Sequence, residues 1–307
     1  MKFSIVIPLY NKQRYIRQAI ESVLAQTLQD FELLVVNDAS TDGSRELAQS
    51  YGRVKLIDHG RNKGLSASRN TGIQNSQAPF IVFLDADDYW EPGFLAEISI
   101  LTEVFSQASL FATAYDEVYP SHVLNPRTLL GDVPNGARLL ITDYFARNLG
   151  QPLYNHSSLC VRKSLFEQIG GYDQELTFSE DVEFGIRANL ASPLAYSNCV
   201  LSHYRAWAEN QITNNGIKDK KIPDLGYLEL EKDREDLKKY LDFERYVLAM
   251  HCKLCGRTEF EKLASLIDPA SLNFKQRLLL ASPAFVVRLI RTFKRTLLRV
   301  GLRWSTY

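Results

Sequence analysis

Three aspartates crowd the end of an apolar run in the stretch FIVFLDADDYWEP. The run from Phe80 to Leu84 is typical of a strand buried on both faces, and Asp85, Asp87 and Asp88 follow it directly. Like charges at a strand end repel one another unless a cation lies between them, and oxygen ligands suit Mg²⁺ or Mn²⁺. This Asp-x-Asp is therefore a candidate metal-diphosphate site. The alternative is a solvated turn that caps the next helix.

Strands and helices alternate before this run. The predicted elements are strands at Phe3 to Ile7 (broken by Pro8), Phe31 to Val36 and Val54 to Ile57, and helices at Tyr15 to Leu28, from Thr41 or Asp42 through Tyr51, and Leu65 to Gln77. Such alternation predicts a parallel sheet covered on both faces, which binds ligands beyond the carboxyl ends of its strands. We therefore expect one edge to gather Pro8 to Asn11, Asp38, Gly64 to Asn70 and Asp85 to Asp88.

The second half is less regular. After a helix from Pro92 to Phe105 and a strand to Val118, the pattern predicts an irregular segment from Tyr119 to Gly150, a strand at Ser157 to Val161, a helix at Lys163 to Ile169, a helix capped by Ser179, a strand at Leu194 to Leu201, and helices at Leu225 to Leu241 and Phe243 to Cys255. An irregular segment of this length inside a domain is usually functional or mobile.

Composition narrows the class of protein. The 307 residues are 45% hydrophobic and 23% charged with a net charge of zero, which is typical of a soluble globular chain and implies no polyanion binding by the whole molecule. The first apolar run is too short for a signal peptide, and four cysteines fit a reducing cytosol. Cys252 and Cys255 beside His251 are half a zinc site, a redox pair or an inert pair on a helix. No second ligand pair follows, which favours the inert pair.

The C-terminal tail is strongly basic. No acidic residue occurs from Pro269 to Tyr307, where eight cations fall: Lys275, Arg277, Arg288, Arg291, Lys294, Arg295, Arg299 and Arg303. Apolar residues at helix-compatible positions between them predict a helix lying on an anionic lipid surface, and the alternative is a helix packed on its own catalytic domain. The most apolar run, Leu278 to Ile290, falls far short of the roughly 20 residues that cross a bilayer. Nucleic acid is not predicted as a partner, because no reader module accompanies the tail.

Six motifs occur together in order: IVIPLYN, VVNDASTDGS, RNKGLSASRNTG, FLDADDYWEP, GGYD followed by SEDVEF, and HYR. Over about residues 1 to 215 the chain resembles inverting glycosyltransferase family 2. The resemblance implies an α/β GT-A fold, Rossmann-like with a mostly parallel sheet and helices on both faces, and a helical C-terminal extension follows it. The expected domains are 1–217, with a nucleotide-sugar half (1–105) and an acceptor half (106–217), and 218–307.

The same resemblance assigns roles to particular residues. It implies that Asp87 ligates Mg²⁺ or Mn²⁺ with Asp85 beside it, that Asp181 is the catalytic base with Glu180 as second choice, and that the UDP-sugar contacts Pro8, Tyr10, Asn11, Asp38, Arg69, Asp85 and Arg205. Plainer interpretations exist: a turn carboxylate at Asp38, a surface ion pair at Arg69, and at Asp181 an acid favoured by the helix dipole. Trp207 replaces a histidine that the family often has near the diphosphate, and His203 is a weaker metal candidate.

The implied enzyme is a metal-dependent inverting hexosyltransferase that moves one sugar from a UDP-sugar to a hydroxyl of a glycan acceptor. The chain lacks the Gln-x-x-Arg-Trp signature and the membrane spans of processive members, so single additions are expected. With the basic tail, we expect a lipid-linked oligosaccharide acceptor and a cytoplasmic enzyme, peripheral on the inner membrane, in cell-surface polysaccharide assembly. The alternatives are a nucleotidyltransferase, which would normally show a Gly-rich basic loop after its first strand, and a non-catalytic carbohydrate-binding module.

Overall fold

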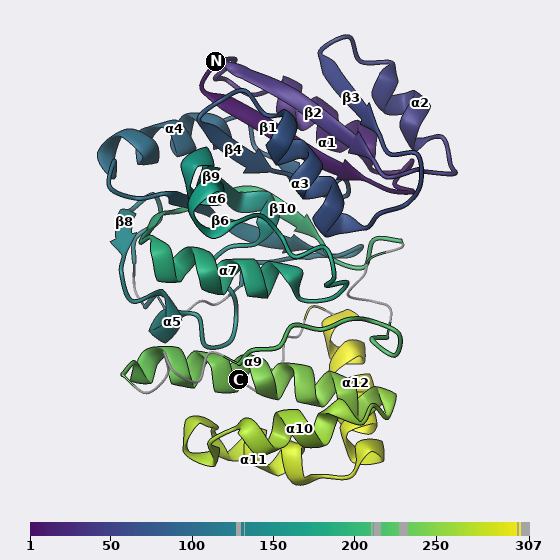
Figure 1. Cartoon of the computed structure of the whole chain (residues 1–307), viewed down its shortest axis with the longest axis vertical. Coiled ribbons are helices and arrows are strands. Elements are labelled where there is room, and N and C mark those ends of the chain that lie inside the picture. The colour runs from purple at the N-terminus through teal and green to yellow at the C-terminus, as the bar shows by residue number, and fades with distance from the viewer. Residues whose placement is uncertain are drawn as a thin grey trace.

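The computed structural model describes residues 1–126, 130–131, 133–209, 211, 216–226, 233–299 and 301. One sheet dominates this part of the chain, with strand order β3-β2-β1-β4-β9-β6-β10-β5, β7 pairing with β6 and β8 with β10 (Figure 1). Its strands are β1 Phe3–Leu9, β2 Phe31–Asn37, β3 Val54–Asp58, β4 Phe80–Phe83, β5 Tyr89–Trp90, β6 Leu110–Val118, β7 Val123–Leu124, β8 Arg138–Ile141, β9 Leu159–Arg162 and β10 Leu194–Arg205.

Helices cover both faces of this sheet. They are α1 Ile16–Leu24, α2 Ser44–Gln49, α3 Leu65–Asn75, α4 Phe94–Val104, α5 Tyr144–Arg147, α6 Lys163–Ile169 and α7 Glu180–Ala191. Alternate residues of β1 face opposite layers: Ile5 and Ile7 join the buried cluster under α1 and α4, whereas Val6 joins the cluster under α3 and α7. The α/β fold class with helices on both faces is therefore confirmed.

The first four strands of the sheet are parallel, as their alternation with helices predicted. One detail was wrong, because Pro8 does not end β1. The carbonyl of Val6 accepts a hydrogen bond from the backbone N–H of Leu84, on the β4 side of the strand. The backbone of Pro8, two residues after Val6, faces the same side. The pairing of β1 with β4 ends at Val6, so the N–H that Pro8 lacks would have had no partner in β4.

The second half of the sheet is mixed. β9 lies between β4 and β6 and is antiparallel to both, whereas β6 and β10 are parallel to each other. The strand predicted at 194–201 extends through Arg205 and pairs with the two-residue strand β5, which the sequence did not predict. The segment from Tyr119 to Gly150 was expected to be irregular, but its described residues include β7, β8 and α5; residues 127–129 and 132 lie outside the described part.

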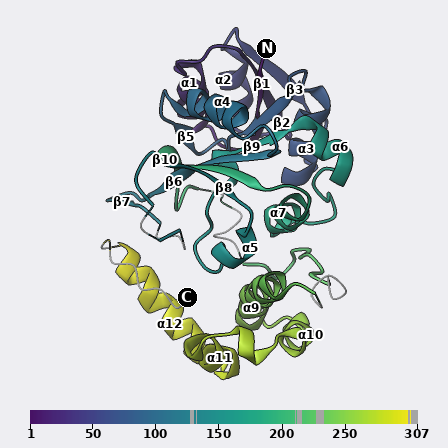
Figure 2. The same ribbon diagram turned by 90° about the vertical axis from the view of Figure 1, so that its left-hand side faces the viewer.

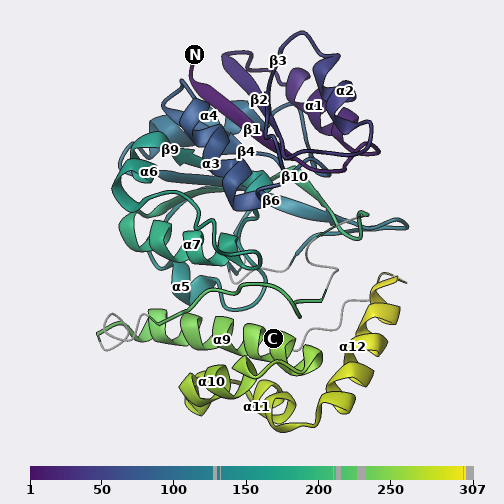
Figure 3. The same ribbon diagram turned by 45° about the vertical axis from the view of Figure 1, so that its right-hand side comes forward.

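A helical extension follows the sheet. It consists of α9 Glu235–Cys255, α10 Glu259–Leu266, α11 Phe274–Ala281 and α12 Ala284–Arg299. The sequence predicted two helices, at 225–241 and 243–255, but α9 is one helix that continues through Asp242. Residues 225–226 and 233–234 are not helical, and residues 227–232 lie outside the described part of the chain. α9 lies beneath α5 and α7, and α12 leaves the α9–α11 layer and rises back toward the level of the sheet (Figures 2 and 3).

The extension shares its core with the sheet. One cluster of buried apolar side chains runs from β1 and β4 through α7 into α9 and α10, where Leu237, Leu241 and Leu263 belong to it. The domain boundary expected at 217/218 stays a prediction. In α9, burial raises the pKa of the Cys252 thiol to about 11, which disfavours its reactive thiolate and supports the inert interpretation of the cysteine pair.

Candidate functional site

The carboxyl ends of β1, β2 and β4 lie at one edge of the sheet. β1 pairs with β2 up to Leu9 and Asn37, and with β4 up to Val6 and Phe83. The predicted nucleotide and metal residues at or just after these strand ends therefore share this edge: Pro8, Tyr10, Asn11, Asp38, Asp85 and Asp87. We call it the site edge.

Tyr10 and Asn11 form the turn that leaves β1. The Tyr10 side chain is exposed, which leaves its ring accessible to a ligand. Asn11 has φ of 50°, a left-handed conformation that asparagine tolerates, and its side-chain oxygen accepts a hydrogen bond of 2.8 Å from the backbone N–H of Thr41. The turn after β1 is thereby fastened to the turn after β2.

Asp38 is buried and already holds three donors. Its Oδ1 accepts from His59 Nδ1 at 2.7 Å and from the backbone N–H of Lys63 at 2.8 Å, and its Oδ2 accepts from the backbone N–H of Gly64 at 2.8 Å. An ionised carboxylate has about four acceptor positions, so one remains on Oδ2. Asp38 thus positions the loop that begins α3, and it keeps the capacity to accept one base N–H.

Arg69 links the two halves of the site. The structure buries it in α3, one turn before Gly72, where an added Cβ would lie 2.2 Å from Val6 Cγ1, so only glycine lets α3 approach β1 this closely. Its guanidinium donates to Asp85 Oδ1 at 3.1 Å and to Glu180 Oε1 at 3.2 Å. Burial alone would lower the pKa of Arg69, but the surrounding negative charges, that of Asp85 foremost, outweigh it and raise that pKa. The surface ion pair considered from sequence is wrong, because this ion pair is internal.

Asp87 is paired with a cation that the sequence did not single out. Lys12 Nζ donates to Asp87 Oδ2 at 2.7 Å and to the backbone carbonyl of Glu209 at 2.9 Å. Burial raises the pKa of Asp87 and the charge of Asp85 adds to it, while Lys12 opposes both. The pair was missed because it joins residues far apart in sequence; the available signal was a cation directly after the Pro8 to Asn11 turn.

Asp88 fastens the turn after β4 to β10. It is buried and accepts from Ser157 Oγ at 2.5 Å and from the backbone N–H of Arg205 at 2.8 Å. Arg205 Nε in turn donates to the backbone carbonyl of Asp87 at 3.1 Å, so this predicted diphosphate residue lies beside the metal candidate. Burial, with the charges of Asp87 and Asp85, raises the pKa of Asp88 well above its ordinary value. His203, the weaker metal candidate, pairs with Glu91 Oε1 at 3.0 Å.

The donor set fits a divalent cation that is shared with a diphosphate. In the described ranges no three His, Cys, Asp or Glu side chains are grouped to hold a metal. Mg²⁺ is commonly bound by one or two carboxylates together with substrate phosphates, so a full protein cage is not required. The charges of Asp85, Asp87 and Asp88 repel one another at this edge, and a cation would relieve that repulsion.

Glu180 and Asp181 begin α7 and point in different directions. Ser179 precedes them with φ of 57°, and its side chain makes no capping bond, so the predicted serine cap is wrong. Glu180 is buried against Arg69, whereas Asp181 is exposed to solvent and accepts a hydrogen bond of 2.9 Å from the backbone N–H of Val182. The surrounding protein nevertheless desolvates Asp181 enough to raise its pKa, which Arg69 opposes. Asp181 is thus available to a ligand while Glu180 is occupied.

The face of α7 that carries Asp181 is directed toward α9. Gly185 and Asn189 follow Asp181 at intervals of four, and Asn189 Nδ2 donates to the hydroxyl of Tyr154 at 3.0 Å. Below them, Glu244 of α9 lies close enough for the charge of Asp181 to act on it. Burial raises the pKa of Glu244 to about 7, with Asp181 adding to the shift and a hydrogen bond to Tyr240 opposing it. The helical extension therefore contributes a carboxyl group near the candidate base, which the sequence did not indicate.

The raised pKa of Glu244 should make the unfolding free energy depend on pH. An unfolded glutamate loses its proton near pH 4.5 and the folded one near pH 7, so the unfolding free energy falls as pH rises between these values. We expect Glu244→Gln to remove this loss, making the variant about 2 kcal/mol more stable than the parent at pH 8 after allowance for partial exposure. Urea unfolding at pH 5 and pH 8 measures it. Glu235→Gln, at the exposed start of α9, is the matched control, and an equal loss in parent and Glu244→Gln would contradict the prediction.

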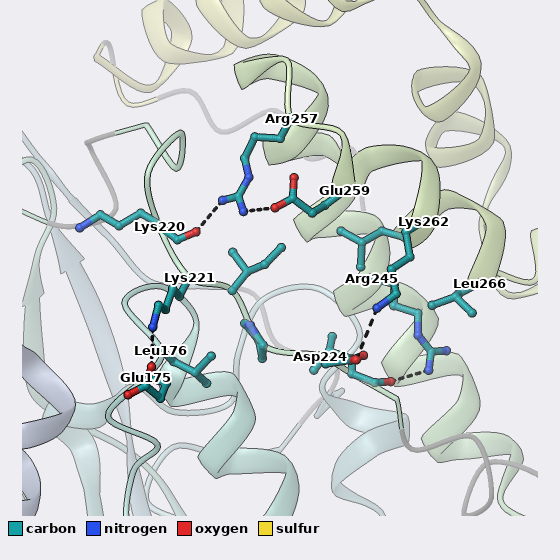
Figure 4. Close-up of a pocket in the computed structure, with 14 residues that line it drawn as sticks. Glu175, Leu176, Lys220, Lys221, Asp224, Arg245, Arg257, Glu259, Lys262 and Leu266 are labelled. Carbon is teal, nitrogen blue, oxygen red and sulfur yellow. Dashed lines mark hydrogen bonds and ion pairs between the residues drawn. The ribbon is translucent and has the colours of Figure 1, made fainter.

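A cavity of about 420 Å³ lies where the extension meets the sheet domain (Figure 4). Segments 175–176 and 220–225 line one side, and α9, α10 and the turn between them line the other. Lys262 pairs with Asp224 across the joint. The pairs of Arg257 with Glu259 and of Lys221 with Glu175 each join groups on one side of it. None of the predicted site residues lines it. A smaller cavity of about 110 Å³ adjoins the site edge beside Asn11, Lys12 and Glu209.

Comparisons with known proteins agree with this fold. A sequence profile described as Glycosyl transferase family 2 matches residues 4–99. A putative glycosyltransferase of Bacillus subtilis, EpsH, is 26% identical over 282 residues, covering 85% of this chain and 78% of EpsH. An uncharacterized glycosyltransferase of Rickettsia prowazekii is 30% identical over 216 residues, covering 70% of this chain and 66% of that protein. S. aureus TarS 1-349, in a crystal structure with UDP-GlcNAc, matches with a TM-score of 0.62 and 16% identity, covering 99% of this chain and 93% of the TarS chain.

The chain belongs to glycosyltransferase family 2 and has the GT-A fold with a helical C-terminal extension. It is accordingly a glycosyltransferase, as the six motifs predicted. This family membership favours sugar transfer over the nucleotidyltransferase alternative. The TarS likeness, at its low identity, concerns the fold alone.

Proposed function

We propose that this chain is a metal-dependent, inverting, non-processive glycosyltransferase that moves one sugar from a UDP-sugar to a hydroxyl of a glycan acceptor. The observation that carries the proposal is the position of Arg69, which is bonded to Asp85 of the Asp-x-Asp and to Glu180, the neighbour of Asp181. One buried cation thereby holds the candidate diphosphate side and the candidate base side together. An inverting transfer requires a base for the acceptor hydroxyl and stabilisation of the leaving diphosphate, and the candidates for these two tasks lie on either side of Arg69.

The proposed reaction is a single displacement. Asp181 accepts the proton of the acceptor hydroxyl, whose oxygen attacks the anomeric carbon as the bond to the UDP oxygen breaks. Glu180 is bonded to Arg69 and is placed to hold that cation rather than to take the proton. Arg205, beside the backbone of Asp87, is placed to meet the charge that develops on the diphosphate. The one carboxyl position left on Asp38 is assigned to the uracil, between Pro8 and Tyr10.

Asp87 and Asp85 are the residues proposed to hold Mg²⁺ or Mn²⁺. The ion supplies Lewis-acid stabilisation of the leaving diphosphate when it is bound. Several carboxylates lie together at this strand end, where burial raises the pKa of Asp87 and Asp88. A bound cation would favour their ionised form. Lys12 neutralises Asp87 in the structure, so a metal that uses Asp87 must compete with this ammonium group.

Lys12→Met tests that competition. With the ammonium removed, we expect Mn²⁺ to bind about three- to tenfold more tightly at pH 8 in the absence of nucleotide, because the metal no longer displaces a positive charge from Asp87. Isothermal titration with Mn²⁺ alone measures the change. Lys63→Met is the matched control, since it removes an exposed cation near the site edge without touching Asp87. Weaker Mn²⁺ binding in Lys12→Met would show that Lys12 supports the site instead of competing for it.

Donor identity is the direct test of the proposed function. A thermal-shift screen of UDP-sugars, GDP-sugars and free UDP with Mn²⁺ is expected to raise the melting temperature only for the uridine compounds, because a ligand that binds only the folded state stabilises it by mass action. Hydrolysis of the stabilising UDP-sugar in buffer with Mn²⁺ then separates an enzyme from a non-catalytic binding module. No shift with any UDP compound would contradict the proposed donor.

The acceptor is proposed to be a lipid-linked oligosaccharide, met at the cytoplasmic face of the inner membrane during cell-surface polysaccharide assembly. The feature that supports a membrane location is the tail, which combines cations, no acidic residue and exposed apolar side chains. In the described part of the chain, no helix has both the length and the apolar character to span a bilayer.

A further inference from the structure

Helix α12 presents a stripe of large apolar side chains to solvent. Phe285, Leu289 and Phe293 recur at intervals of four, so they lie along one face, and they are 70%, 72% and 54% exposed. Among the described residues nine large apolar side chains are exposed, and five of these fall in α11 and α12. Exposed apolar groups are ordinary when scattered singly, but a concentration of this kind marks an interaction surface.

Other faces of α12 contribute contacts that attach it to the rest of the protein. Val287, on another face, is the buried apolar residue of the helix, and Val286 and Ile290 are partly covered. Arg288 Nη2 donates to the backbone carbonyl of Leu254 at 3.0 Å and so ties α12 to the end of α9. The alternative considered from sequence, in which the apolar side of the tail packs on the catalytic domain, therefore does not account for the exposed stripe.

Cations flank the stripe. Arg288 and Arg295 are exposed and lie on the same side of it around the helix, and the Arg288 guanidinium has further N–H donors besides the one that binds the carbonyl of Leu254. The preceding helix repeats the arrangement, with Phe274 and Leu278 72% and 57% exposed and Lys275 and Arg277 exposed beside them. We call these nine residues the tail surface: Phe274, Lys275, Arg277, Leu278, Phe285, Arg288, Leu289, Phe293 and Arg295.

We propose that the tail surface docks on an anionic lipid bilayer, with its phenylalanines and leucines inserted at the level of the acyl chains and its lysine and arginines at the lipid phosphates. A helix that lies in the bilayer interface has these features: an apolar stripe, flanking basic residues and moderate overall hydrophobicity. This inference names the partner surface for the proposed transferase, and it rests on the proposed function only for the identity of the lipid-linked acceptor.

Charge decides between a bilayer and a second copy of the chain. Residues 269–307 carry eight cations and no acid, so two such surfaces face to face would bring like charges together. Anionic lipid headgroups are complementary to the same surface, and long arginine side chains reach the phosphates while the apolar groups insert. The bilayer is therefore the occupant that fits both the apolar and the charged part of the surface.

Vesicle binding by the full chain tests the inference. We expect co-sedimentation with vesicles of phosphatidylcholine and phosphatidylglycerol to be at least tenfold stronger than with phosphatidylcholine alone, and to weaken at high salt. The triple variant Phe285→Ser, Leu289→Ser, Phe293→Ser should bind at least tenfold more weakly. Val104→Ser with Val123→Ser is the matched control, because those side chains are 58% and 56% exposed elsewhere on the molecule, and it should bind as the parent does.

A second variant guards against misfolding of the triple variant. Leu289→Trp keeps an apolar group on the stripe, and its fluorescence should shift to shorter wavelength with the acidic vesicles and not with phosphatidylcholine. The inference is overturned if the parent chain does not bind acidic vesicles, if the folded triple variant binds them equally well, or if the stripe variants instead convert a dimer into a monomer. Loss of sugar transfer with vesicle binding intact would count against the proposed function and leave this inference standing.

Discussion

Replacement of Asp181 by asparagine is expected to reduce kcat for sugar transfer about 10³-fold while leaving UDP affinity unchanged. Asparagine has nearly the same shape but cannot accept the proton of the acceptor hydroxyl, and a positioned general base contributes about 10²- to 10⁴-fold. Asp181 is exposed to solvent beside the occupied pair of Arg69 and Glu180, so its removal leaves those bonds in place. Release of UDP in the presence of acceptor measures kcat, and titration with UDP and Mn²⁺ measures affinity.

The pH dependence of the parent enzyme checks the same assignment. The protein surrounding Asp181 raises its pKa, and a base works only when ionised, so activity should fall with decreasing pH at values above the ordinary aspartate range near 4. Asp219→Asn, which removes an exposed carboxylate, should leave both the rate and the profile unchanged. An Asp181→Asn enzyme with nearly full activity would transfer the role of base to Glu180, and Glu180→Gln would then be the inactive variant.

The site edge was predictable because it depends on local patterns. Strand, helix and turn signals up to Asp88 are each contained in about ten residues, and the parallel alternation then forces the strand ends to one side. The order of the later strands was not predictable in this way. β9 lies antiparallel between β4 and β6, and β4 and β6 are far from it in sequence. The short strand β5 forms by pairing with the far end of β10, which continues through Arg205.

The sequence also failed to predict which charged side chains pair with one another. The sequence identified Arg69 and Asp85 as individual site residues, but their bonding to each other and to Glu180 depends on how α7 packs against the sheet. Lys12 was overlooked because its partner Asp87 lies far from it in sequence. In α9 the expected break near Asp242 is absent because Asp242 and Arg245 pair on the helix, with both side chains buried, and Arg245 also donates to the backbone carbonyl of Leu225. Acidic residues inside a helical pattern therefore did not mark its end.

Asp87→Asn is expected to abolish metal-dependent donor binding, with UDP-sugar affinity in Mn²⁺ at least 100-fold lower and hydrolysis of the donor lost. Asparagine cannot supply the anionic oxygen that a hard divalent cation requires, whereas it can still accept a hydrogen bond from Lys12. Ionisation of Asp87 is opposed by burial and by the charge of Asp85, so removing the carboxylate should leave the melting temperature unchanged or higher. Loss of binding without loss of stability identifies a functional group rather than a structural one.

Asp88→Asn provides the contrast, because Asp88 has the same chemistry one residue further along but is bonded to Ser157 and to the backbone of Arg205. An amide in its place keeps one oxygen acceptor, but its NH₂ group faces a group that already donates, so a buried hydrogen bond is lost at about 1–3 kcal/mol. Removing the charge of Asp88 also removes its repulsion with Asp87 and Asp85, which offsets part of this loss. We expect Asp88→Asn to lower the melting temperature while retaining Mn²⁺-dependent UDP binding in the folded fraction. If the two variants exchanged these behaviours, the metal would belong to Asp88, and the pairing of Lys12 with Asp87 would be purely structural.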